Sequence, residues 1–273
     1  MGYNVFVIFC ARGGIPSIKR CAKGGYMLTS GLLADAINSG NTTVFWLGII
    51  GSLIVAYLLG SVNTSIMISK LVYRSDIRTH GSGNGGLTNM HRTFGLKAAG
   101  LTLLGDMLKT VIAVIIPMLL FGFTYTAGLC TNPISYLSGA AAVLGHVYPI
   151  YYGFKGGKGV LVTSTMALVV SPAIFGILLL VFILTVYLSK YISLGSVTVA
   201  VLYPVMVNVY SITFTHRPPF WTTLFVTILL AIFIVWLHRE NLKRIGNRTE
   251  RKFSFKKKAE VEKPTAIEDD DEE

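Results

Sequence analysis

The chain has 273 residues, of which 52% are hydrophobic and only 14% are charged, and its mean hydropathy is +0.62. Soluble domains carry about a quarter charged residues, so this composition argues against a soluble globular protein. The formal net charge is +11, but the basic residues flank apolar runs and no nucleic-acid-binding pattern accompanies them. Anionic lipid headgroups or phosphate-bearing substrates are therefore better candidate partners than nucleic acid.

The first residues of the chain differ in character from the long apolar region after them. Residues 1–26 carry several basic side chains without the layout of a signal peptide, because these come after the short apolar stretch. The codons for Lys23-Gly24-Gly25 can form a ribosome-binding site correctly spaced before a start at Met27, although any Lys-Gly-Gly run permits such codons. We expect residues 1–26 to be a non-native or unstructured leader and residues 27–43 to be an external segment.

Apolar segments long enough to cross a bilayer, which takes about 20 residues as a helix, come next in chain order. They cover residues 44–69, 99–123, 133–150, 194–211 and 220–237. The stretch 159–189 is either one long tilted helix or a short helix followed by a full one that restarts at Pro172. Proline is tolerated at the start of a helix and disrupts its interior.

The Lys and Arg residues decide between these two alternatives, since cytoplasmic loops are enriched in both. The basic segments are residues 70–97, 153–158 and 189–193 and the tail. They share one side only if two helices meet at Pro172. We predict an all-α membrane protein with seven transmembrane helices over residues 44–238, one of them short, with the N-terminus outside. Residues 239–273 are predicted to form a cytoplasmic tail, basic and then acidic, that is largely disordered.

The first candidate site segment runs from Asp76 to Arg92 and combines glycines, small polar side chains and arginines before a helix. A flexible loop is the alternative interpretation. Glycines let backbone amides approach an anion, and arginine offers phosphate a bidentate fork. Ser82 does not fit a G-x-S-x-G elbow, because His80 occupies the first glycine position, so a phosphate ligand is favoured over an acyl-enzyme nucleophile. The candidate residues are Arg78, His80, Ser82, Gly83, Asn84, Thr88, Asn89 and Arg92.

The second segment, from Gly145 to Gly159, contains Lys-Gly-Gly-Lys-Gly at the start of a helix. It is not a Walker A loop, because the order of glycine and lysine is reversed. A helix N-terminus with two ammonium groups is nevertheless a good anion cradle. A purely topological anchor would account for the lysines but not for the glycines. The candidates are His146, Lys155, Gly156, Gly157, Lys158 and Gly159.

Two further groups of polar residues lie at the inner ends of predicted helices. His238 and Asn241 share a helix face where the last membrane helix emerges. Asp106 and Lys109 lie three apart in the second helix, and intramembrane ionisable residues indicate either a functional site or a structural ion pair. The only carboxylates between residues 44 and 239 are Asp76 and Asp106, so we expect neither a metal site nor a cofactor. No histidine begins an H-x4-D motif.

From Val44 to Arg251 the sequence resembles the acyl-phosphate-dependent glycerol-3-phosphate acyltransferases of bacteria. The matching motifs are Gly60-Ser61, Asp76-Ile-Arg78, His80-Gly-Ser82-Gly-Asn84, Thr88-Asn89-x-x-Arg92, Asp106-x-x-Lys109, Gly145-His146-x-x-Pro149, Phe154-Lys155-Gly-Gly-Lys158-Gly159 and His238-Arg239-Glu240-Asn241. Departures such as Leu87 in place of the usual alanine, or Asn63 in place of proline, affect no functional group. The resemblance implies a seven-helix fold in the bacterial cytoplasmic membrane with its site at the cytoplasmic face. It also implies functional roles for Ser82, Arg92, Lys158, His238 and Asn241.

The resemblance therefore implies transfer of an acyl group from acyl phosphate to the sn-1 hydroxyl of glycerol 3-phosphate, which gives lysophosphatidic acid and phosphate. Membrane lipids and an enzyme that produces acyl phosphate are the other expected partners. The general base is His146, His238 or a substrate phosphate oxygen. The alternative function is a transporter or sensor of an organic phosphate, but transporters place polar groups at the bilayer midplane within repeats, and no repeat is evident.

Overall fold

The computed structural model describes residues 31–33, 41–122, 125–126, 129–130, 132–216 and 218–253. The predicted leader, most of the predicted external segment and the tail beyond Phe253 lie outside these residues. The fold is therefore described from α3 to the basic part of the tail.

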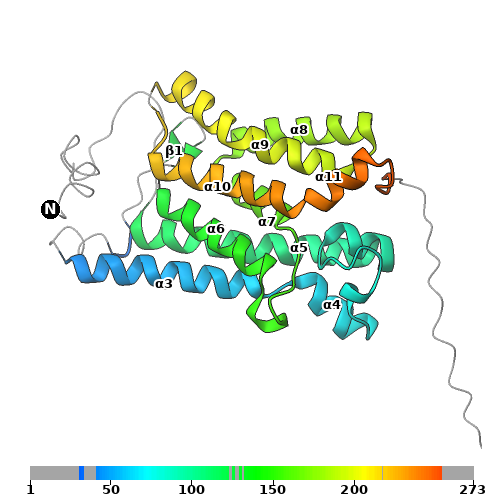
Figure 1. The fold of residues 1–273 in the computed structure, drawn as a ribbon. Coiled ribbons are helices and arrows are strands. Elements are labelled where there is room, and N and C mark those ends of the chain that lie inside the picture. Colours follow the sequence, from blue (N-terminus) through cyan, green and yellow to red (C-terminus); the bar gives the residue numbers. More distant parts are fainter. Residues whose placement is uncertain are drawn as a thin grey trace, which may run out of the picture.

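Long helices lie side by side along one common direction and form a bundle (Figure 1). Short 3-10 helices, η1 (Ile77–Thr79) and η2 (Ile150–Tyr152), follow α4 and α6, and a π-helix, η3 (Ser211–Thr215), follows α9. The α-helices are α3 (Thr42–Ser61), α4 (Thr64–Tyr73), α5 (Leu87–Phe121), α6 (Pro133–Val147), α7 (Val160–Val170), α8 (Pro172–Ser189), α9 (Ile192–Tyr210), α10 (Trp221–Leu237) and α11 (Arg239–Gly246).

Helix α3 packs against α6 at very short range because both helices carry glycine at the contact. A Cβ atom on Gly60 would lie 2.2 Å from the carbonyl oxygen of Ala142, and one on Gly145 would lie 2.2 Å from that of Tyr57. Any side chain at these positions would force the two backbones apart. Buried side chains from α3, α5, α6, α7, α9 and α10 form the core around this pair.

The first predicted span is broken near its C-terminal end. Helix α3 ends at Ser61, and α4 begins at Thr64 after the buried Asn63, whose side chain accepts a hydrogen bond from the amide of Ile66 at 3.2 Å. Asparagine is a favoured N-cap because its short side chain satisfies an amide in the first helical turn. The predicted segment 44–69 is therefore two helices rather than one.

Helix α5 begins earlier than its apolar segment, at Leu87 instead of residue 99. Gly95 interrupts it with a φ of 84°, a backbone conformation that favours glycine. The additional turns carry Thr88, Asn89 and Arg92 of the first candidate segment, so hydropathy alone could not reveal them. The kink separates these turns from the apolar part of α5.

The predicted restart at Pro172 is confirmed. Helix α7 ends at Val170, Ser171 has non-helical backbone angles, and α8 begins with Pro172 in its first turn. A short hairpin before α6 supplements the expected all-α fold: β1 (Tyr125–Thr126) pairs antiparallel with β2 (Leu129–Cys130). Figure 1 places β1 and the start of α3 at one end of the bundle and α4 and α11 at the other.

The outer surface of the bundle is apolar. Leu104, Leu180 and Ile232 expose 66%, 69% and 61% of their surfaces, and contiguous apolar surface of this kind is rare on soluble monomers. Within the described residues, four helical stretches are long and apolar enough to cross a membrane, and the number is five if the α10–α11 pair, bent by 52°, is taken as one span. Helices α6 and α7, with 15 and 11 residues, are shorter. The fold is that of a helical membrane protein, whereas seven crossings stay a prediction.

Candidate active site

One large pocket, with a volume of about 1030 Å³, joins the three candidate segments at the α11 end of the bundle. Its polar part is lined by Ser82, Gly83, Asn84, Thr88, Asn89, Arg92, His146, Lys158, Gly159, His238, Asn241 and Arg244. Its apolar part continues between α7, α8, α9 and α10 and is lined by Leu168, Phe175, Leu178, Phe182, Tyr203 and Leu230. A single cavity therefore offers a cationic region and a region suited to a hydrocarbon chain.

The first loop, residues 74–86 between α4 and α5, is shaped by the buried side chain of Asn89. Its carbonyl oxygen accepts a hydrogen bond from the amide of Ser82 at 3.0 Å, and its Nδ2 donates to the carbonyl oxygens of His80 and Asn84 at 2.9 and 3.0 Å. One side chain thus satisfies several backbone groups of the loop and fixes its path. The predicted ligand Asn89 lines the pocket, and its amide also holds the loop that presents Ser82.

Arg78 and His80 belong to the predicted site but do not line the pocket. The guanidinium of Arg78 forms an ion pair with Asp76 at 2.7 Å and donates to the carbonyl oxygens of Tyr152 and Lys155 at 2.7 and 3.1 Å. Its hydrogen bonds hold the pKa of the Asp76 carboxyl well below the usual range. His80 contacts the hydroxyl of Ser75 at 2.6 Å. Arg78 therefore ties the first loop to the second.

The second loop, residues 148–159 between α6 and α7, packs tightly against the end of α6. The amides of Gly156 and Gly157 donate to the carbonyl oxygens of Val147 and His146 at 3.0 and 3.1 Å. A Cβ atom on Gly156 would lie 2.0 Å from the carbonyl oxygen of His146, and one on Gly157 would lie 2.1 Å from its Nε2. These two glycines and Lys155 shape the loop without lining the pocket. They place Lys158 and Gly159 on the pocket wall.

Helix α7 begins directly at the pocket. Gly159 adopts a left-handed conformation with a φ of 73°, and no side chain caps the first turn of α7. The uncapped amides and the helix dipole favour an anion at this point. This part of the structure supports the prediction of an anion cradle around Lys158.

The third segment meets the second in the pocket. The ammonium of Lys158 donates a hydrogen bond to Oδ1 of Asn241. The Nδ1 atom of the buried His238 lies 2.8 Å from the carbonyl oxygen of Ile234, an acceptor that places the imidazole proton on Nδ1 and leaves Nε2 as an acceptor in the neutral ring. Burial, helped by the positive charge of Arg244, lowers the pKa of Lys158 to about 8, while the negative charge of Glu250 opposes this shift.

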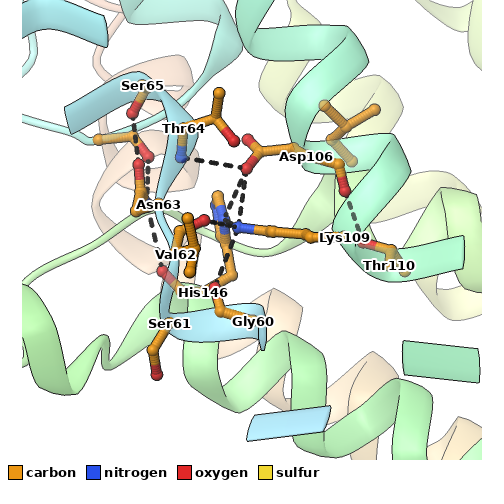
Figure 2. Close-up of polar contacts among 12 residues, drawn as sticks. Gly60, Ser61, Val62, Asn63, Thr64, Ser65, Asp106, Lys109, Thr110 and His146 are labelled. Atoms are coloured by element: carbon orange, nitrogen blue, oxygen red, sulfur yellow. Dashed lines mark hydrogen bonds and ion pairs between the residues drawn. The ribbon is translucent and has the colours of Figure 1, made fainter. Parts of the chain in front are cut away.

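A buried polar cluster lies beneath the pocket, at the break between α3 and α4 (Figure 2). The ammonium of Lys109 lies 2.7 Å from Oδ1 of Asp106 and 3.1 Å from Nδ1 of His146. It also donates to the carbonyl oxygens of Gly60 and Val62 at 3.0 and 2.8 Å, which the helix break leaves without helical partners. Lys109 itself does not line the pocket, whereas Asp106 and His146 do. This arrangement favours the structural interpretation of the Asp106–Lys109 pair.

Sequence reasoning missed three polar residues near Lys158: Ser193, Arg244 and Glu250. All three line the pocket. Glu250 is the only carboxylate between Glu240 and Glu260 and stands among basic residues, which is the signal that could have identified it. Ser193 carries no comparable signal, because α9 contains several small polar residues. In the part of the chain that the structure describes, no three metal-ligating side chains lie together.

The fold and the pocket define a class: a helical integral membrane protein whose pocket joins a cationic polar region to an apolar one. The sequence matches the family model described as glycerol-3-phosphate acyltransferase over residues 50–248. The chain belongs to this family, which confirms the resemblance inferred from its motifs.

Individual relatives agree with this assignment. The glycerol-3-phosphate acyltransferase of Syntrophomonas wolfei is 40% identical over 204 residues, covering 75% of this chain and 96% of the relative. That of Bacillus subtilis is 38% identical over 203 residues, covering 74% and 96%. The crystal structure of PlsY (YgiH), an integral membrane glycerol 3-phosphate acyltransferase, in its glycerol 3-phosphate form is similar with a TM-score of 0.66 and 33% identity. The match covers 76% of this chain and 96% of that chain. The lysophosphatidic acid form of the same protein gives a TM-score of 0.64 and 32% identity.

Proposed function

We propose that this protein transfers an acyl group from acyl phosphate to the sn-1 hydroxyl of glycerol 3-phosphate, which gives lysophosphatidic acid and inorganic phosphate. The observation that carries the proposal is the continuity of the pocket: Arg92, Lys158 and the start of α7 line one part, and apolar side chains line the rest. An acyl phosphate has the same division into an anionic head and a hydrocarbon chain. Membership of the family supports the same reaction.

The substrate contacts are assigned by position in the pocket. Arg92, Ser82 and the amides of the first loop hold one phosphate, and Lys158 with the start of α7 holds the other. Asn84, Thr88 and Asn89 complete the wall next to the first phosphate, and His238 and Asn241 complete the polar end. The hydrocarbon chain occupies the apolar part between α7 and α10.

The reaction requires no covalent enzyme intermediate, because an acyl phosphate is already activated. The sn-1 oxygen attacks the acyl carbonyl carbon, the bond between that carbon and the bridging oxygen breaks, and phosphate leaves with the bonding electrons. The hydroxyl proton passes to a base, for which Nε2 of His238 is available. A phosphate oxygen of a substrate is the alternative base. Correct positioning of the reactants alone can lower the barrier by about 7–11 kcal/mol.

His146 is the weaker of the two candidate histidine bases. Its Nδ1 contacts Lys109 at 3.1 Å, and its ring packs against Gly157. A base must lie within hydrogen-bonding reach of the proton that it removes. His238, whose second nitrogen is an acceptor in the same pocket, meets this condition better.

The membrane orientation belongs to the same proposal. Seven crossings place residues 74–86, 153–159 and 238–253 at the cytoplasmic face of the bacterial cytoplasmic membrane, with α3 beginning outside. The concentration of basic residues in these segments supports this orientation. After removal of native cysteines, a cysteine at position 155 should react only from the cytoplasm and one at position 127 only from outside. Labelling of both positions from the same side would contradict seven crossings.

The decisive experiment for the reaction uses the full chain purified in detergent. Glycerol 3-phosphate and palmitoyl phosphate should yield lysophosphatidic acid, and the reaction should continue in EDTA. Acyl-CoA or acyl carrier protein should not replace the acyl phosphate, so a separate enzyme must supply this donor in the cell. A chain that forms no product, but moves glycerol 3-phosphate into sealed vesicles, would establish the transporter alternative instead.

A second experiment tests direct transfer. Enzyme is mixed with labelled acyl phosphate without glycerol 3-phosphate, quenched in acid and examined for label on the protein. Ser82 acts as a ligand in the proposal, so no adduct should form, and Ser82→Ala should only weaken turnover. A stoichiometric acyl adduct on Ser82 would overturn direct transfer and leave the overall reaction standing.

A further inference from the structure

The segment after α11 folds back over the polar end of the pocket. The amides of Thr249 and Glu250 both donate to the carbonyl oxygen of Arg244, at 2.8 and 3.1 Å, and Arg248 makes the turn with a left-handed φ of 59°. Further along, the amide of Phe253 donates to the carbonyl oxygen of Lys190 at 2.7 Å. The backbone is thus fixed on both sides of Glu250 and directs its side chain inward.

The carboxylate of Glu250 contacts three side chains, one from α9 and two from α11. Its Oε1 accepts hydrogen bonds from Ser193 Oγ of α9 at 2.5 Å and from Asn241 Nδ2 of α11 at 2.8 Å. Its Oε2 accepts from Arg244 Nε at 2.7 Å, and only 7% of the side chain is exposed. A buried carboxylate with this number of charge-assisted and neutral donors is firmly held.

The amide of Asn241 lies between this carboxylate and the ammonium of Lys158. Its Nδ2 donates to Glu250, and its Oδ1 accepts from Lys158. A carboxylate can accept only from the NH₂ group, and an ammonium can donate only to the oxygen. The two charges therefore permit one orientation of the amide. Without the carboxylate, only Lys158 would oppose rotation of this amide.

We propose that Glu250 is a positioning residue that orients the amide of Asn241 and, through it, directs the ammonium of Lys158 into the phosphate pocket. The inference rests on the proposed function insofar as Lys158 and Asn241 contact substrate there. Glu250 lies beyond residue 248, where the match to the family model ends. It acts through Asn241 and touches no reacting atom.

The charge of Glu250 also has a measurable consequence. Burial would raise the pKa of Glu250, yet hydrogen bonds from Ser193, Asn241 and Arg244 lower it overall, so the group stays negative. This negative charge raises the pKa of Lys158 against burial and against the positive charge of Arg244. The other titratable and charged groups that line the pocket are Arg92 and Asp106 of α5, His146 of α6, Tyr203 of α9, His238, Arg239 and Glu240 at the end of α10 and in α11, and Arg251 of the tail.

The test compares Glu250→Gln with Glu262→Gln in the full chain. The second variant removes the same charge from the acidic tail, outside the described residues. In Glu250→Gln, kcat/KM for glycerol 3-phosphate should fall about tenfold, in line with loss of a charged hydrogen bond. The pH at which kcat/KM declines on the alkaline side should move down by about one unit, because Lys158 loses its proton more readily. Glu262→Gln should match the wild type in both measurements.

An unchanged alkaline limit in a folded Glu250→Gln protein would overturn the inference, even if turnover fell. If that variant does not fold, Ser193→Ala removes one donor to the same oxygen and keeps the charge. It should lower kcat/KM about threefold, and an activity equal to wild type would then overturn the inference. A cycle with Asn241→Ala separates the mechanism further: the loss from Ser193→Ala should vanish in that background, whereas additive losses would contradict action through Asn241.

The proposed function can fail separately. If the wild-type chain makes no lysophosphatidic acid, the proposed reaction is wrong. The role of Glu250 is then tested by calorimetric titration of the protein with inorganic phosphate. The affinity of Glu250→Gln for phosphate should decline at a lower pH than that of wild type. Equal pH dependence of phosphate binding in the two proteins would overturn the role of Glu250.

Discussion

Two lysines in this protein have opposite surroundings. Lys109 is buried beneath the pocket, and its ammonium has four contacts: two carbonyl oxygens, the Asp106 carboxylate and the His146 ring. Lys158 lies on the pocket wall, and among the described residues its ammonium has one hydrogen-bond partner, Asn241. An ammonium has three protons to donate, so Lys109 has none left for a ligand, whereas Lys158 has two. Lys109 lies within α5 and Lys158 lies in the loop before α7. Both are near the same cavity, and their hydrogen-bond partners distinguish the cation that holds the fold from the one left open to a ligand.

Removing Lys109 should have the largest effect on stability. Lys109→Met leaves Asp106 as a buried charge without its closest partner and leaves the carbonyl oxygens at the α3–α4 break unsatisfied. Breaking one side of a buried ion pair costs about 3–5 kcal/mol. Thermal unfolding in detergent should therefore occur at a clearly lower temperature. The double variant Asp106→Asn with Lys109→Met should recover part of this loss, and a fully stable single variant would contradict the structural role.

Removing Lys158 should leave the fold intact and impair activity. A charge-assisted hydrogen bond is worth about 1.5–3 kcal/mol, so Lys158→Ala should lower kcat/KM roughly ten- to hundredfold. The matched control is Lys190→Ala, because that exposed lysine lies over the ring of Tyr187 and outside the pocket. Equal losses in both variants would show that Lys158 contributes only to the general charge of this face.

Arg92 provides a test of geometry at constant charge. Arg92→Lys keeps the positive charge but replaces the planar fork with a single ammonium, so it cannot bind phosphate in a bidentate way. Its kcat/KM for glycerol 3-phosphate should stay close to that of Arg92→Ala. Recovery of most of the wild-type value by lysine would indicate that charge alone is needed at this position.

A change of pH should have the smallest effect on activity. The pKa of Lys158 is lowered to about 8, mainly by burial, and the ammonium is the form that binds phosphate. Activity at low substrate concentration should therefore decline as the pH rises through about 8. At saturating substrate the limit should move upward, since bound phosphate stabilises the ammonium. Lys158→Arg should remove this limit, and a limit that persists in the arginine variant must belong to another group.

The sequence predicted those features that depend on neighbouring residues. Pro172 ends one helix and starts another through its own ring, and the Lys-Gly-Gly-Lys-Gly run marks a helix start with a lysine on the pocket wall. The break at Asn63 was missed because Lys109, distant in sequence, stabilises it. The early turns of α5 were missed because they are polar and lie outside the apolar window.

Two residues show the limits of reasoning from composition. Arg78 carried the features of a phosphate ligand, but Asp76 two residues earlier binds its guanidinium in the structure. The short spacing of these opposite charges could have indicated the pair. Glu250 was treated as part of a basic tail, because only the chain reversal at Arg248 brings its carboxylate to Asn241. Such a contact depends on tertiary structure and has no local pattern.

The tight fit of the second loop against α6 has a consequence for genetic screens. Gly156 and Gly157 do not line the pocket, yet a methyl group on either would collide with His146. Replacing either glycine would push the loop away from α6 and displace Lys158 with it. A screen of all single substitutions would therefore score these two positions as intolerant as the lysine itself. Sensitivity to mutation in this segment measures available space as well as chemistry, and intolerance at the two glycines alone does not identify a substrate contact.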